Sequence, residues 1–151
     1  EQTGSPAELY ARPCSTFTAE FVGDPPMAMI EGAALGRPGA TVGIRPEHIA
    51  LAAPDEAHIV GTVEDTEFLG ALSRVVVGHA AARGLVATVR GAAAHAPGET
   101  VGLKLPEEYR VLFDALTGAR EKDPQQDCGE EGRQTGPRDS REAHPLQSTT
   151  D

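Results

Sequence analysis

The sequence is poor in aromatic residues: it has no tryptophan, two tyrosines and four phenylalanines among 151 residues. A hydrophobic core must therefore be built from Val, Leu, Ile and Ala, which bury less apolar area per side chain than aromatic residues do. A chain of this length allows one domain with a modest core.

Long apolar runs and an excess of basic residues are also absent. No run approaches the roughly 20 apolar residues that a helix needs to cross a bilayer, so we expect no direct membrane insertion. The first residues lack the basic start and apolar block of a signal peptide. The net charge is −10, from 13 basic and 23 acidic residues. Because this charge repels phosphates, we expect no nucleic-acid partner.

Sequence motifs of catalysis and cofactor binding are missing. Nothing matches the phosphate-binding pattern G-x-x-x-x-G-K-S/T, the nucleophile elbow G-x-S-x-G or the metalloprotease pattern H-E-x-x-H. The two cysteines have no neighbours at metal-ligand spacing, and the five histidines are scattered. The sequence therefore predicts no catalytic, cofactor-binding or metal site, and no enzyme activity of the chain itself.

Two short helices are predicted at the beginning of the chain, over 5–12 and 15–22. Ser5 and Glu8 have the spacing of a capping box, and the second segment restarts after a proline with a new serine cap. Phe17 and Phe21 lie four residues apart, hence on one helical face, and we expect them to pack within the fold rather than form a docking stripe.

From residue 27 onward the pattern changes to short β-strands. Gly and Pro separate them, and their apolar residues alternate or run continuously. Many short strands in roughly 80 residues indicate a small β-barrel or sandwich, and closure into a five-stranded barrel would remove exposed edges. The expected strands are 27–32, 41–45, 49–51, 59–69, 72–77, 85–89, 101–105 and 109–113.

Residues 121–151 have a different composition. The apolar residues among them are Cys128, Ala143 and Leu146 alone. Such a segment cannot bury enough surface to offset the entropy of ordering, so we predict a disordered acidic tail.

The stretch Gly43-Ile44-Arg45-Pro46-Glu47-His48-Ile49 brings ionisable side chains to the end of a strand. Arg45 could clamp an anionic ligand or a partner's carboxylate. The alternative, which we favour, is a structural corner in which Arg45 pairs with Glu47 and His48 caps the turn. Arg45, Glu47 and His48 are therefore the candidate regulatory or interface residues. The carboxylates of Glu64, Asp65 and Glu67 are interpreted as a solvated strand face.

Four stretches in order resemble ATP-binding subunits of ATP-binding-cassette (ABC) importers. Residues 2–27, with Pro13, Phe17, Phe21 and Gly23 among the matching positions, resemble the segment that closes their nucleotide-binding domain. Residues 43–49 resemble the signature of their C-terminal TOBE domain, an OB-fold-like regulatory module, and 61–70 resemble the strand that follows. Residues 112–118 resemble the closing motif of the maltose and glycerol-3-phosphate type.

The resemblance implies a division of the chain into three parts. Residues 1–26 would be the end of a truncated ATP-binding domain and a linker, 27–120 the TOBE domain, and 121–151 the tail. The parent subunit would use ATP and Mg²⁺ to drive import of a sugar or glycerol 3-phosphate. Because the ATPase motifs are missing here, only a regulatory and dimerisation role carries over.

The same resemblance implies partners and a location. The chain would form a homodimer beneath importer permease subunits, in the cytoplasm at the inner face of the cell membrane, and could receive a regulatory protein or a small ligand. An alternative is a free-standing OB-like module that binds a small anion, an oxyanion or a sugar.

Overall fold

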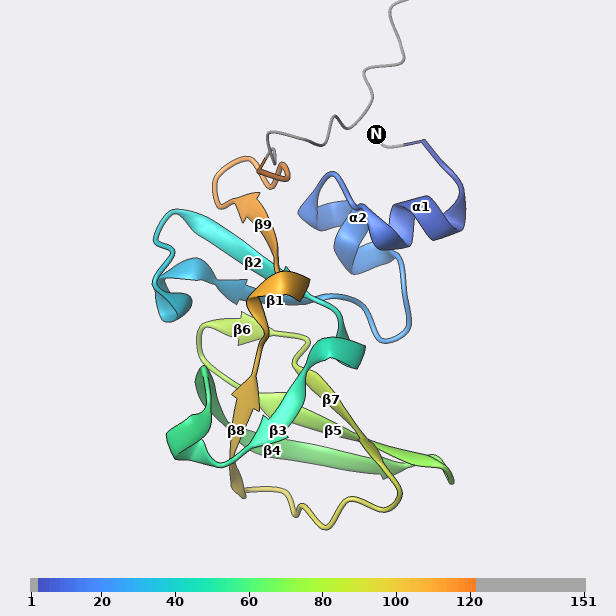
Figure 1. The fold of residues 1–151 in the computed structure, drawn as a ribbon, viewed down its shortest axis with the longest axis vertical. Coiled ribbons are helices and arrows are strands. Elements are labelled where there is room, and N and C mark those ends of the chain that lie inside the picture. The colour runs from blue at the N-terminus through green and yellow to red at the C-terminus, as the bar shows by residue number, and fades with distance from the viewer. Residues whose placement is uncertain (1–2, 122–151) are drawn as a thin grey trace, which may run out of the picture.

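The structure is a computed structural model that describes residues 3–121 (Figure 1). The fold is mainly β, as predicted, with strands in two antiparallel sheets. The four-stranded sheet has the order β6 (Ala82–Arg83), β1 (Ala28–Glu31), β2 (Ala40–Ile44), β9 (Val111–Asp114). The five-stranded sheet has the order β3 (Ala50–Ala52), β8 (Thr100–Lys104), β4 (Ile59–Phe68), β5 (Leu72–Gly78), β7 (Val86–Arg90).

The expectation of one closed five-stranded barrel is wrong. The five-stranded sheet curls until its edge strands β3 and β7 come close, but within residues 3–121 no ladder of backbone hydrogen bonds joins them. Strand β3 is only three residues long, and all three pair with β8. The remaining strands form a second sheet, so the two sheets share one core instead of closing separately.

The predicted strands agree with the observed ones, with one omission. Strand β6 was not predicted, because two residues are too few to show an alternating pattern; they pair with Met29 and Ile30 of β1. Strand β4 has a shift of register between Val63 and Asp65, where its polar part begins.

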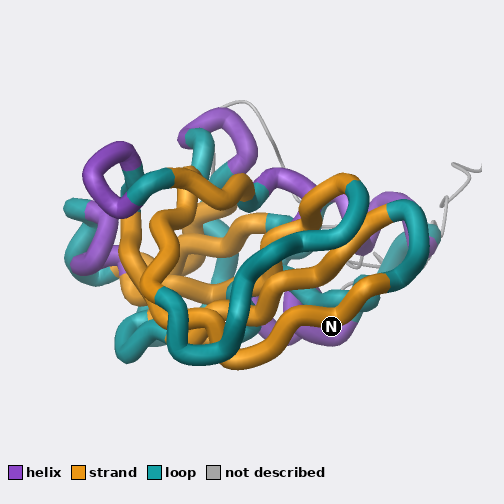
Figure 2. Tube along the Cα trace, turned by 90° about the horizontal axis from the view of Figure 1, so that it is seen from below, coloured by secondary structure: helices purple, strands orange, loops and turns teal. Residues whose placement is uncertain are grey.

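Aliphatic side chains from both sheets make the main core, as the composition predicts. Figure 2 shows the strands in the middle of the molecule, with short helical segments around them. The core residues are Ala28, Ile30, Val42, Ile44, Ile49, Ile59, Val63, Val75, Val77, Leu85, Ala87, Val101, Leu103 and Leu105. A second, smaller cluster lies under the helices and contains Ala19, Met27, Met29 and Phe113.

Both predicted helices are present, as α1 (Pro6–Ala11) and α2 (Thr16–Phe21). The capping box at Ser5 forms as expected, with Ser5 and Glu8 each bonded to the other's backbone N–H. The expectation that Phe17 and Phe21 pack within the fold is wrong. They are 75% and 79% exposed and stack on each other, with ring centroids 6.0 Å apart.

Four single turns of 3-10 helix complete the described part of the chain: η1 (Gly32–Leu35), η2 (Pro46–His48), η3 (Pro54–Glu56) and η4 (Glu107–Tyr109). No helix in residues 3–121 is long and apolar enough to span a membrane. The tail predicted for 121–151 lies outside the described residues, apart from Glu121.

Candidate functional site: the Arg45 corner

The candidate residues sit where β2 passes into η2, and we call Arg45, Pro46, Glu47 and His48 the Arg45 corner. Arg45 has extended backbone angles, and Pro46 then begins the 3-10 turn with its fixed φ. The turn closes through hydrogen bonds from the His48 N–H to the Arg45 carbonyl, 3.0 Å, and from the Ile49 N–H to the Pro46 carbonyl, 3.1 Å. The backbone of this motif is thus a structural corner, as favoured from the sequence.

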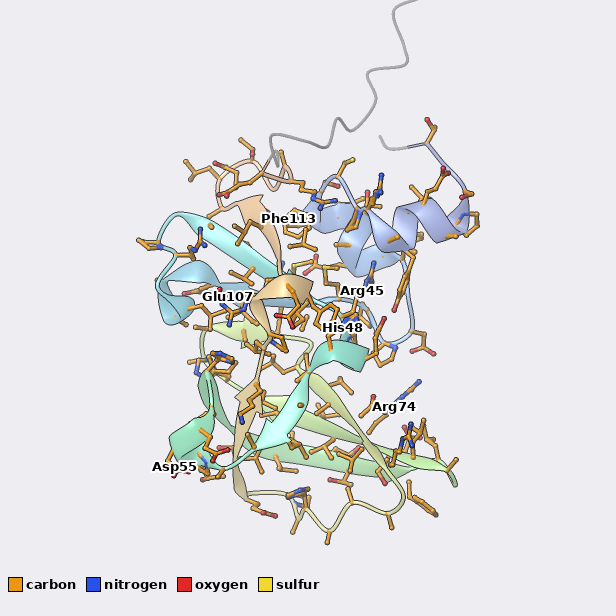
Figure 3. All side chains as sticks on the ribbon, in the orientation of Figure 1. Arg45, His48, Asp55, Arg74, Glu107 and Phe113 are labelled. Atoms are coloured by element: carbon orange, nitrogen blue, oxygen red, sulfur yellow. The ribbon has the colours of Figure 1, made fainter. Side chains whose placement is uncertain are left out.

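The Arg45 side chain points away from the corner and into the helical segment (Figure 3). It is only 5% exposed. Its Nη1 donates to the carbonyls of Ala19, 3.2 Å, and Val22, 2.6 Å, and its Nη2 donates to that of Tyr10, 2.8 Å. Val22 is the C-cap of α2, so a cation here complements the negative end of that helix.

Tyr10 packs its ring on the Arg45 guanidinium, whose carbon lies 3.9 Å from the ring centroid. Burial lowers the pKa of Arg45, and the nearby Tyr10 and Glu47 oppose that effect. The Tyr10 hydroxyl donates to the Glu47 carboxylate at 2.5 Å. Arg45 and Glu47 therefore both contact Tyr10, and the direct Arg45–Glu47 ion pair expected from the sequence is not among the ion pairs of residues 3–121.

His48 does not cap the turn, which corrects the second part of the corner hypothesis. Its ring stacks on Tyr109 of η4, with centroids 3.8 Å apart and planes 3° apart. The His48 Nδ1 atom is buried and has no hydrogen-bond partner. The turn η2 links β2 to β3, and η4 links β8 to β9, so each leads from one sheet to the other. The His48–Tyr109 contact therefore holds these two connections together beside the corner.

The three candidate side chains therefore diverge instead of converging on one point. Arg45 reaches the helices, Glu47 reaches Tyr10, and His48 reaches Tyr109. An anion-binding site needs several donors aimed at one place, and both terminal nitrogens of Arg45 already donate to carbonyls. Sequence reasoning missed Tyr10 and Tyr109, because residues so far apart in the chain share no spacing rule.

Besides Arg45, other contacts fix the helical segment to the sheets. Arg83 of β6 forms an ion pair with Glu20 of α2. The Thr16 N–H donates to the Gly118 carbonyl at 2.9 Å. The backbone of Ser15 pairs with that of Ala119 in an isolated antiparallel β-bridge. Together with the cluster around Phe113, these contacts make the helices and the four-stranded sheet one packed unit.

The closing stretch after β9 is a hydrogen-bonded turn around Asp114. Its Oδ1 accepts from the backbone N–H groups of Leu116, 3.0 Å, and Thr117, 2.7 Å, and from the Thr117 hydroxyl, 3.0 Å. The bonds from Thr117 and Leu116 lower the pKa of Asp114. Gly118 follows with φ of 68°, a left-handed conformation that favours glycine.

Two further features lie outside the Arg45 corner. A groove of about 370 Å³ is lined by charges of both signs and two aliphatic side chains: Arg37, Val42, Glu107, Glu108, Arg110 and Leu112. Glu64, Asp65 and Glu67 are exposed on β4, consistent with a solvated face. Within residues 3–121, no group of three His, Cys, Asp or Glu side chains is placed to hold a metal ion.

Comparison with known proteins indicates the family to which this chain is similar. The TOBE domain family matches residues 42–113, which include the Arg45 corner and end in β9. The sn-glycerol-3-phosphate import ATP-binding protein UgpC of Salmonella choleraesuis (strain SC-B67) is 38% identical over 143 residues, covering 80% of this chain and 40% of that protein.

Relatives of the same name show similar coverage. UgpC of Escherichia coli O157:H7 is 34% identical over 143 residues, with 80% of this chain and 40% of that protein covered. UgpC of Paraburkholderia xenovorans (strain LB400) is 33% identical over 150 residues, with 80% and 41% covered. The chain thus spans about 40% of the length of these relatives. The chain therefore contains a TOBE domain of a carbohydrate ABC importer ATP-binding subunit.

Proposed function

We propose that this chain is the regulatory and dimerisation part of an importer ATP-binding subunit, and that it does not itself hydrolyse ATP. The imported solute is glycerol 3-phosphate or a sugar, because the matched relatives are named for sn-glycerol-3-phosphate import. The partners are a second copy of the subunit and the importer permeases. The chain is then placed in the cytoplasm, peripheral to the inner face of the cell membrane.

The observation that carries this proposal is the joint between the helices and the TOBE domain. The similarity to the relatives covers 80% of the chain, whereas the TOBE match alone covers residues 42–113. Arg45, inside the TOBE match, binds carbonyls of Tyr10, Ala19 and Val22, outside it. A free-standing ligand-binding module has no need of this joint, whereas an accessory domain attached to a preceding domain does. We accordingly propose 1–26 as the end of that preceding domain and 27–120 as the TOBE domain.

Calorimetry with Mg-ATP tests the proposal that this chain does not bind the nucleotide. The 151-residue chain has no phosphate-binding loop in its sequence. We therefore expect no saturable heat when Mg-ATP is titrated into it. Saturable binding would contradict the proposal that nucleotide chemistry belongs to another part of the subunit.

The alternative function, binding of a small anion or sugar, has its own test. Titration of phosphate, glycerol 3-phosphate and maltose into the ¹⁵N-labelled chain, followed by NMR, should leave the signals of Arg45 and His48 unmoved. Both Arg45 terminal nitrogens already donate to carbonyls, and His48 is stacked on Tyr109. Saturable shifts confined to the corner would instead favour the free-standing module.

A further inference from the structure

We propose that the groove between the turn η4 and the four-stranded sheet binds a free α-amino acid with an aliphatic side chain. Its volume of about 370 Å³ falls within the range of small-molecule sites. Its lining comes from three parts of the chain: the loop before β2, the strands β2 and β9, and the segment around η4. Within residues 3–121, the lining does not include the Arg45 corner, so this site is distinct from the corner and goes beyond the proposed function.

Two aliphatic side chains make the floor of the groove. Val42 of β2 and Leu112 of β9 are cross-strand partners, so their side chains stand on the same face of the sheet. Val42 is buried in the core, and Leu112 is half-buried and packs against it. An aliphatic ligand side chain laid on this floor leaves water, which favours binding.

Arg110 supplies the group that binds the carboxylate of the ligand. Its side chain is only 11% exposed, and its Nε donates to the Leu105 carbonyl at 2.7 Å, which fixes the guanidinium in place. No hydrogen bond within residues 3–121 uses its Nη1 or Nη2. These two nitrogens therefore present a planar pair of donors that matches the two oxygens of a carboxylate.

Glu107 places a carboxylate beside the Arg110 guanidinium. This residue, labelled in Figure 3, begins η4 and has a side chain that is 81% exposed. Its Oε1 lies 3.7 Å from Arg110 Nη1, which is too far for a hydrogen bond, so both groups keep their capacity for a ligand. The carboxylate and the ammonium of an α-amino acid are carried by one carbon atom and can therefore meet Arg110 and Glu107 together.

The balance of charge around the groove favours a zwitterion over a simple anion. Arg37 and Glu108 are exposed and add one charge of each sign to the pair of Arg110 and Glu107. Neither Arg37 nor Glu108 is among the ion pairs of residues 3–121. Because two arginines and two glutamates cancel, phosphate or glycerol 3-phosphate gains no electrostatic advantage here, whereas a ligand with both charges finds an opposite charge for each.

The test titrates L-leucine into the full 151-residue chain, labelled with ¹⁵N, and follows the amide signals by NMR. Saturable shifts are expected in residues 107–112 and in the loop around Arg37. Two analogues separate the charges: isocaproate lacks the ammonium, and isoamylamine lacks the carboxylate. Each should bind at least about tenfold more weakly than leucine, because each leaves one charged side chain of the groove without its partner.

The variant Glu107→Gln keeps the size of the side chain and removes its charge at an exposed position. Leucine should bind it at least about tenfold more weakly, whereas isocaproate should bind it no more weakly than the wild type, since isocaproate carries no ammonium. The matched control is Glu67→Gln, an exposed residue of β4 outside the groove, which should leave the affinity for leucine unchanged. Circular dichroism of both variants checks that they remain folded.

Every other result overturns the inference. Absence of saturable shifts at millimolar leucine would show that the groove is not an amino-acid site. Isocaproate or isoamylamine binding as tightly as leucine would identify a site for one charge only. Equal leucine affinity of the wild type and Glu107→Gln, or shifts outside the groove, would place the ligand elsewhere. None of these results changes the expected outcome of the Mg-ATP titration, so the proposed function is tested separately.

Discussion

Arg45 occupies the position at which three segments meet: β2, α1 and α2. Its sequence context predicts a corner, because Pro46 and the following turn end the strand. Its partners could not be predicted, because the carbonyls of Tyr10, Ala19 and Val22 belong to segments whose packing is set by tertiary structure. The local prediction of an Arg45–Glu47 pair failed for the same reason: Tyr10, far away in sequence, contacts both side chains.

Replacing Arg45 with Ala should destabilise the fold by about 2–4 kcal/mol, because the carbonyls of Tyr10 and Val22 lose their side-chain donor, Ala19 keeps only its bond from the Met27 N–H, and the cation at the end of α2 is removed. Arg45→Lys should recover only part of this loss, since an ammonium group lacks the planar fork that reaches several acceptors. Arg90→Ala, at an exposed position of β7, is the control and should change stability by less than about 0.5 kcal/mol. Denaturant unfolding measures all three; equal stability of Arg45→Ala and wild type would refute the structural role.

Tyr10 gives a pH-dependent test of the same joint. Burial, followed by the hydrogen bond to Glu47, raises the pKa of Tyr10 above its ordinary 10.0. Its contribution to stability is therefore complete below pH 10 and is lost as the pH rises through the raised value. Wild type should lose more stability than Tyr10→Phe over this alkaline range. Thermal unfolding at a series of pH values measures the difference, and parallel curves for the two proteins would contradict it.

At the scale of elements, sequence patterns predicted the strands well and their assembly poorly. Alternation within 59–69 and 101–105 reports which face of a strand is apolar, and both strands form. The same patterns do not report which strand pairs with which, so they favoured one closed barrel where the strands form two sheets. Phe17 and Phe21 show the limit for helices: their spacing indicates a shared face, but not whether this chain or another surface covers it.

Gly43 of β2 provides a prediction at this scale. A Cβ atom there would lie 2.5 Å from the Met27 sulfur and 2.9 Å from the Phe113 ring. Gly43→Ala should therefore destabilise the protein by about 1–3 kcal/mol, and Gly43→Val by more, because the small cluster under α2 must open. Thr62→Ala, on the exposed face of β4, is the control. Unchanged unfolding of Gly43→Ala would mean that this cluster is not tightly packed.

The Asp114 turn gives a second prediction at this scale. Hydrogen bonds from Thr117 and Leu116 lower the pKa of Asp114 below its ordinary 3.8. The stabilisation is therefore present above pH 3.8 and disappears as the pH falls toward the lowered value. Wild type should lose its stability advantage over Asp114→Ala in this acidic range. Unfolding curves for both proteins as the pH is lowered measure this, and an advantage that persists at the lowest pH would contradict it.

At the scale of the whole molecule, the described residues form two antiparallel sheets with a helical segment packed on one of them, rather than a closed barrel. One face of the helices is bound to the TOBE domain through Arg45 and the cluster around Phe113, and the other presents Phe17 and Phe21. Composition and motifs predicted the β class and the importer family. They could not indicate which side of the helical segment is buried, because the burial of a side chain depends on the assembled structure.

Solute uptake by intact cells tests whether this chain takes part in import. A strain lacking the gene that encodes this chain, and the same strain with the gene restored, are supplied with radiolabelled sn-glycerol 3-phosphate or maltose. We expect uptake of one of these solutes to fall to background in the deletion strain and to return on restoration. Uptake of both at the wild-type rate without the gene would contradict the assignment to import of these solutes.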